Sequence, residues 1–143
     1  MRTVNGVVQF GLCVLLGATL ACGEDDEGLE ADKLGVGGAC ALVEDCPVVE
    51  QTNMDGETEE VQLQCLDSFK GGYCGIADCG ADADCPDGAR CVAHTDGTNY
   101  CFRVCVDKSE CNANRGLDVE ANCSANIVFV DSGGGKACVP PAA

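Results

Sequence analysis

Residues 79–101 read CGADADCPDGARCVAHTDGTNYC and contain four cysteines. Two further sets of four cysteines lie within residues 40–138, and in every set the first two are six residues apart with an acidic residue directly before the second. The sets are Cys40, Cys46, Cys65 and Cys74; Cys79, Cys85, Cys91 and Cys101; and Cys105, Cys111, Cys123 and Cys138. A pattern repeated at this scale predicts tandem structural units, which we place at residues 40–74, 79–101 and 105–138.

Each module ends in the same kind of sequence. The third and fourth cysteines flank the turn-forming stretches Lys70-Gly71-Gly72, Asp96-Gly97 and Gly133-Gly134-Gly135. Residues with strand propensity lie nearby, as in Tyr100-Cys101-Phe102 and Ile127-Val128-Phe129-Val130, which favours hairpins. We therefore expect a small disulfide-rich fold of three tandem four-Cys modules, each a loop plus a short β-hairpin, with little regular secondary structure.

The twelve cysteines of the modules predict six disulfides, two in each module. Four cysteines permit three connectivities, and we favour first-to-third and second-to-fourth pairing. The chain has 143 residues, 14 cysteines and no tryptophan. Its aromatic residues beyond position 21 are Phe69, Tyr73, Tyr100, Phe102 and Phe129. Because so few large apolar side chains are present, we expect no conventional core and a stability that comes mainly from the disulfides.

The first 21 residues have the features of a secretory signal peptide. Arg2 precedes an apolar run over residues 7–16, and Thr19-Leu20-Ala21-Cys22 follows it. These four residues resemble the lipobox of bacterial lipoproteins, although that family usually has leucine where this chain has Thr19. The resemblance implies cleavage before Cys22, acylation of Cys22 with fatty acids such as palmitate, and a place in the bacterial cell envelope, which we expect to be the outer membrane.

The number of cysteines supports this interpretation. Removing residues 1–21 leaves 13 cysteines, and assigning Cys22 to lipid leaves twelve that can pair completely. The alternative is an ordinary cleavage site with Cys22 in a disulfide. Residues 22–39 lack aromatic residues and are acidic and glycine-rich, so we expect a disordered tether with a typical reach of about 20–25 Å.

The modules also resemble known repeats. The spacing Asp-Cys-Pro-Asp-Gly-Ala-Arg-Cys at residues 84–91 is similar to the short cysteine-rich repeats of surface lipoproteins from myxobacteria and related bacteria, and loosely to Dickkopf N-terminal and EGF-like modules. The resemblance implies a disulfide repeat and no particular activity. The first and third modules depart from compact EGF spacing, with 18 residues between Cys46 and Cys65 and 14 between Cys123 and Cys138.

Residues that could support metal or catalytic chemistry are sparse. No two cysteines are separated by two residues and His94 is the only histidine, so thiolate zinc and thioredoxin-like redox sites are not expected. His94 lies in a predicted turn, where we expect it to be exposed and without a catalytic role. We therefore expect no enzymatic activity and no cofactor. Weak calcium candidates are Asp78, Asp82, Asp84 and Asp87, and the alternative for these residues is a solvated acidic loop.

The net charge of -16 disfavours nucleic acid as a partner, because a polyanion is repelled. Taken together, the residues predict a membrane-anchored lipoprotein whose ectodomain has a binding or structural role toward a protein or glycan. The alternatives are a calcium-dependent adhesin-like module and, third, a small inhibitor or enzyme.

Overall fold

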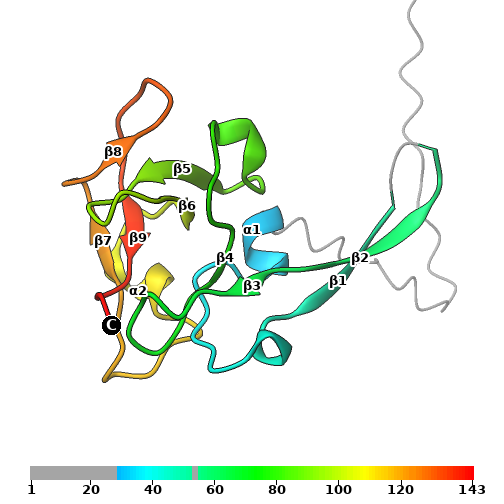
Figure 1. Ribbon diagram of the computed structural model, residues 1–143, viewed down its shortest axis with the longest axis horizontal. Helices are drawn as coiled ribbons and strands as arrows, with labels where there is room; N and C mark the ends of the chain where they lie inside the picture. Colours follow the sequence, from blue (N-terminus) through cyan, green and yellow to red (C-terminus); the bar gives the residue numbers. More distant parts are fainter. Residues whose placement is uncertain (1–28, 53–54) are drawn as a thin grey trace, which may run out of the picture.

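The computed structural model describes residues 29–52 and 55–143, so the predicted leader and Cys22 lie outside the described residues. The helices are short and the strands pair as small antiparallel sheets (Figure 1). The elements are α1 (Glu30–Lys33), the 3-10 turn η1 (Val43–Asp45), β1 (Val48–Thr52), β2 (Thr58–Gln62), β3 (Gln64–Cys65), β4 (Cys74–Gly75), the 3-10 turn η2 (Asp82–Asp84), β5 (Ala89–Ala93), β6 (Asn99–Arg103), α2 (Lys108–Cys111), β7 (Asn122–Ser124), β8 (Val128–Phe129) and β9 (Ala137–Val139). The predicted small disulfide-rich fold is confirmed. In the described part of the chain, no helix has the length and apolar character needed to traverse a lipid bilayer.

The six disulfides connect the first cysteine of each module to the third and the second to the fourth. They are Cys40–Cys65, Cys46–Cys74, Cys79–Cys91, Cys85–Cys101, Cys105–Cys123 and Cys111–Cys138. No bridge among them crosses from one module to another. The predicted pairing is therefore confirmed in each module.

The third and fourth cysteines of every module stand directly opposite each other in a hairpin. Cys65 faces Cys74 between β3 and β4, and the corresponding pairs lie between β5 and β6 and between β7 and β9. Each of these cysteines is bridged to the preceding loop rather than to its neighbour across the hairpin. Two disulfides thus join one loop to one hairpin. A hairpin of two strands has only marginal stability in water by itself.

The acidic residue before the second cysteine closes that loop. The Asp45 carboxylate accepts hydrogen bonds from the backbone N–H groups of Ala41 and Leu42, at 2.7 and 3.0 Å. Asp84 accepts the same two bonds in the second module, and Glu110 accepts one from the residue after Cys105. These bonds hold the pKa of the Asp45 carboxyl below its usual value, the bond from Ala41 contributing most. The repeated acid is therefore a structural part of the module.

The first module carries a hairpin that the sequence did not predict. Strands β1 and β2 lie between Cys46 and Cys65 and pair over five residues, with Val49 opposite Val61 and Glu50 opposite Glu60. Figure 1 shows this hairpin extending away from the rest of the described chain, on the side opposite β7 and β9. The insertion therefore leaves the disulfide frame of the first module unchanged.

The modules are joined into one body by strand pairing. Strand β8, in the third module, pairs with β5 of the second, so that Val92 faces Phe129 and Ala93 faces Val128. The strand expected at residues 127–130 thus completes a three-stranded sheet, ordered β6-β5-β8, rather than a hairpin of its own module. The first module also meets the segment that follows the third module, through an isolated bridge between Phe69 and Ala142.

A shared aromatic core contradicts the expectation that no conventional core can form. The Phe69 ring centroid lies 5.7 Å from that of Tyr73, 5.0 Å from Tyr100 and 5.7 Å from Phe102, all edge to face. Each of these four side chains is buried. The prediction was wrong because aromatic residues from two modules combine in one cluster, whereas each module was assessed alone.

The predicted tether is too long. Ala31, Leu34 and Val36 are buried in the same core, and α1 begins at Glu30. The Ala31 N–H donates to the carbonyl of Asp87 at 2.8 Å, which ties the segment to the second module. The expectation of a disordered spacer is therefore wrong for residues 29–39, because three apolar side chains bury enough surface to fix an otherwise acidic, glycine-rich stretch.

Arg115 links the third module to the first and to the amino-terminal segment. Its buried guanidinium donates to the carbonyls of Val119 at 2.7 Å, Gly72 at 2.9 Å, Lys70 at 2.9 Å and Gly37 at 3.1 Å. Burial lowers the pKa of the guanidinium from its ordinary value. A single side chain thus satisfies four backbone acceptors from three parts of the chain.

Candidate functional site

Two adjoining hollows lie where the amino-terminal segment, the second module and the third module meet. Both are lined by Arg103, at the end of β6, and by Glu110 of α2. Their volumes are about 260 and 360 Å³, and the larger is within the range of small-ligand pockets. We call the larger one the Val106 hollow and the smaller one the Gly35 hollow, after a residue that lines each.

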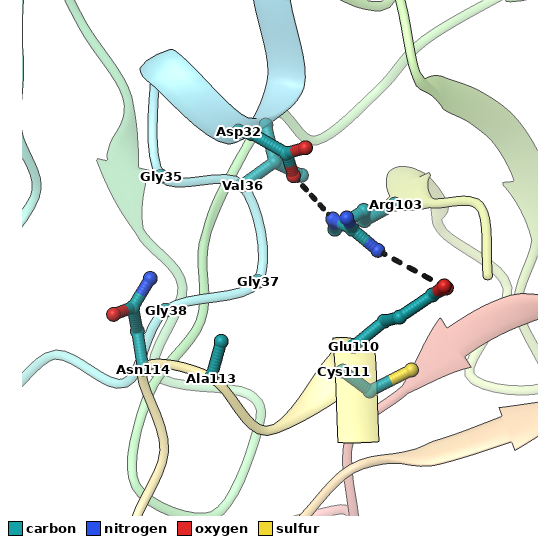
Figure 2. A pocket seen from close by; sticks show the side chains of 10 residues that line it. All are labelled: Asp32, Gly35, Val36, Gly37, Gly38, Arg103, Glu110, Cys111, Ala113 and Asn114. Atoms are coloured by element: carbon teal, nitrogen blue, oxygen red, sulfur yellow. Dashed lines mark hydrogen bonds and ion pairs between the residues drawn. The ribbon is translucent and has the colours of Figure 1, made fainter. Parts of the chain in front are cut away.

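Arg103 is held between two carboxylates on the wall shared by the hollows. Figure 2 shows the guanidinium between Asp32 of α1 and Glu110 of α2. Its Nε donates to Asp32 at 2.5 Å, and its Nη1 lies 3.7 Å from the Glu110 carboxylate. The bond to Asp32 is the main reason that the pKa of Arg103 is raised above its ordinary value. Arg103 is therefore a fixed cation that joins three segments.

The Gly35 hollow has a glycine-rich wall, but it is not an anion cradle. Gly35, Gly37 and Gly38 line it, and glycine-rich loops bind phosphates when their N–H groups point at the ligand. Here the three N–H groups donate instead to the carbonyls of Asp32, Cys74 and Gly35. The backbone of this wall has no donor available for a ligand.

The Val106 hollow combines apolar and cationic side chains. Its apolar lining consists of Leu29, Val104, Val106 and Phe129, and its cationic lining of Arg90, Arg103 and Lys136. The Arg90 guanidinium lies 3.9 Å from the centroid of the Phe129 ring and pairs with Asp82 at 2.7 Å. A surface of this composition can contact a group that has both an apolar and an anionic part.

Lys136 is the least neutralised cation of this hollow. Its ammonium donates to the carbonyl of Val106 at 3.3 Å. Among residues 29–52 and 55–143 no carboxylate lies within 4.0 Å of it, whereas Arg90 has one and Arg103 has two. Lys136 helps to lower the pKa of Asp107 through electrostatic attraction, but among the described residues it forms no ion pair that an anionic group at the mouth of the hollow would have to displace.

The predicted calcium candidates do not form a common site. Asp82 pairs with Arg90 and also accepts the N–H of Cys91 at 2.9 Å, and the Asp84 carboxylate closes its own loop. Asp78 is exposed with a left-handed φ of 62°, and the Asp87 N–H donates to Glu30. In the described part of the chain, the triplets of potential metal ligands within 4.8 Å of one another are cysteines that the disulfides already use. The structure thus assigns Asp82 and Asp84 to local hydrogen bonds.

His94 is not an exposed turn residue. Its side chain is 16 % exposed, its ring centroid lies 5.5 Å from that of Phe69, and its Nδ1 is 3.1 Å from the Asp96 carboxylate. Asp96 also accepts the Tyr100 hydroxyl at 3.0 Å and the Thr98 N–H at 2.9 Å. The sequence did not indicate this burial, because the aromatic neighbours of His94 come partly from another module. These contacts anchor the β5–β6 turn to the aromatic core.

The residues of the Val106 hollow were not predicted from the sequence. Leu29, Arg103 and Lys136 are separated by dozens of positions, and no motif connects them. The one available indication was the rarity of cations in an acidic chain, which has eight lysines and arginines against 24 acids. In comparisons with known proteins, the chain matches no family model, no curated protein and no solved structure.

Proposed function

We propose that the chain is a lipid-anchored protein of the bacterial cell envelope, acylated on Cys22, whose disulfide-stapled ectodomain has a binding or structural role. The observation that carries this proposal is the pairing of the cysteines. All twelve cysteines from Cys40 to Cys138 are bridged to one another. None of them is left for Cys22, which favours acylation of Cys22 over the alternative of a disulfide in the ectodomain.

A non-catalytic role is supported by the surroundings of the polar residues. His94 and Asp96 stabilise a turn, and the Tyr73 hydroxyl, whose pKa burial raises well above its usual value, accepts the Arg103 N–H at 3.3 Å. The Val106 hollow is a concave surface lined by both apolar and cationic side chains. We propose that the ectodomain contacts a protein or glycan partner through this hollow, and that it does so at the outer membrane.

Mass spectrometry of the mature amino terminus tests the anchor. We expect acyl groups on Cys22 and recovery of the protein in the membrane fraction. Cys22→Ala should move the protein to the soluble fraction, while Cys13→Ala, in the predicted leader, should leave the mature protein membrane-bound. An unmodified Cys22 in a disulfide would contradict the proposal.

A further inference from the structure

The described part of the chain begins on the wall of the Val106 hollow. Leu29, the first described residue, lines that hollow. It packs so closely on the backbone of Gly88 that a Cβ added there would lie 2.9 Å from the Cβ of Leu29. The N–H groups of Asp32 and Lys33 also donate to the Leu29 carbonyl, at 2.9 and 3.2 Å. The position of Leu29 on this face is therefore fixed by packing and by hydrogen bonds.

The proposed anchor is seven residues from this point. Covalent geometry limits the separation of Cys22 and Leu29 to about 25 Å at full extension, and a flexible chain of that length has a typical reach of about 15 Å. A domain of this size has a radius of gyration of about 13 Å, so the path around its surface to the opposite face is about 50 Å. A lipid on Cys22 therefore cannot bring the opposite face to the bilayer, and at its typical reach it favours the face around Leu29.

That face carries side chains suited to the interfacial layer of a phospholipid membrane. Val106 is 76 % exposed and Leu29 is 42 % exposed. Lys136 lies beside them without a carboxylate within 4.0 Å among the described residues. Apolar side chains flanked by a lysine are the combination with which peripheral proteins contact head groups.

Part of the acidic surface lies elsewhere. Residues 34–69 contain eight acidic residues and no lysine or arginine, and this stretch includes the β1–β2 hairpin. Figure 1 shows that hairpin extending away from β8 and β9, which lie beside the Val106 hollow. A third of the 24 acidic residues thus lies in the stretch that includes this hairpin, while Glu24, Asp25, Asp26 and Glu27 lie between Cys22 and Leu29. This charge disfavours an anionic bilayer and leaves zwitterionic head groups as the partner.

We propose that the face formed by Leu29, Val106 and Lys136 around the Val106 hollow rests on the phospholipid head groups. The two apolar side chains enter the interfacial layer, and the Lys136 ammonium binds a lipid phosphate. This docking rests on the proposed acylation of Cys22, because one residue pair and one lysine bind a bilayer too weakly alone. The ectodomain then has a fixed orientation, with the β5–β6 turn directed away from the lipid.

The absence of tryptophan from the chain allows a direct test. Val106→Trp introduces a single tryptophan at an exposed position, and Thr95→Trp introduces one in the β5–β6 turn as the matched control. Strand β5 runs from Gly88, beside Leu29, toward that turn and spans about 13 Å. Thr95 therefore lies at the end of the strand that is far from Leu29. Both variants are purified with their native amino terminus and reconstituted into phosphatidylcholine vesicles with brominated acyl chains.

We expect a blue shift and a loss of fluorescence for Val106→Trp in these vesicles, and a water-like spectrum with little loss for Thr95→Trp. Inserting about twenty glycine and serine residues between Gly28 and Leu29 raises the typical reach to about 30 Å and should reduce both effects at position 106. Lys136→Glu should reduce them as well.

The outcomes separate the two proposals. Failure of both variants to float with vesicles, together with an unacylated Cys22, would overturn the anchor and the docking with it. Flotation of both variants with equal spectra and equal quenching would overturn the docking alone and leave the anchor intact.

Discussion

Replacing the buried Arg115 with methionine should strongly destabilise the protein. Methionine keeps an unbranched stem of similar length and removes all the donors. The four carbonyls that Arg115 satisfies would remain in place, at least two of these bonds being buried. Each bond contributes about 1 kcal/mol net, so the four together give a loss of about 4 kcal/mol.

Removing a buried charge by itself can be favourable, because the charge no longer has to be desolvated. Here that gain is smaller than the loss of hydrogen bonding. The substitution removes the donors and leaves the carbonyl acceptors buried without partners, which costs more than removing both. Arg115→Lys should recover only part of the stability, since one ammonium cannot reach carbonyls in three segments.

Thermal unfolding under non-reducing conditions measures this effect. At about 4 °C per kcal/mol for a domain of this size, the melting temperature should fall by about 16 °C. Lys108→Met is the control, because its exposed ion pair with Glu120 should contribute less than about 1 kcal/mol. If Arg115→Met proves as stable as Lys108→Met, Arg115 does not hold the three segments together.

Three further predictions concern the core, the loops and the disulfides. Phe69→Ala should lower the free energy of unfolding by about 3–5 kcal/mol in denaturant titrations with the disulfides intact; a loss below about 1 kcal/mol would mean that the aromatic cluster is not a core. The folded-state pKa of Asp45 lies below its ordinary value of 3.8, so its contribution is complete above that pH and is lost as the pH falls through the folded value. Asp45→Asn should therefore lower the melting temperature at pH 7 and reduce its fall on acidification, and identical pH profiles would contradict this. Reduction of the six disulfides should lower the free energy of unfolding by about 3 kcal/mol for each bridge. The sum exceeds the usual stability of a domain, so circular dichroism should show unfolding. A native-like spectrum of the reduced protein would refute the estimate.

The cysteine spacing predicted the covalent frame because that part of the fold is local. Each loop, hairpin and pair of bridges lies within one repeat, and the turns at Gly71-Gly72 and Gly97 have the positive φ that such turns favour. Gly72 could not be replaced, because a Cβ there would lie 1.9 Å from the Cys40 carbonyl. These requirements are visible in the sequence as repeated residues at fixed offsets.

The contacts between modules could not be predicted in the same way. Ala31 and Leu34 are spaced as one face of a helical turn, but an acidic, glycine-rich background obscured that pattern. The β1–β2 hairpin had a turn at Asp55-Gly56 between strand-favouring residues, which was the indication available. The Val106 hollow had only the rarity of cations as an indication, because its lining comes together only when β8 of one module pairs with β5 of another.

The disulfide frame has a consequence for how this protein can vary. Between the second and third cysteines the three modules have 18, 5 and 11 residues, yet the bridges and the opposition of the last two cysteines are the same in all three. The frame therefore separates the part of each repeat that determines folding from the part that can change in length and chemistry. The β1–β2 hairpin is accordingly a position where foreign peptides could be grafted for display.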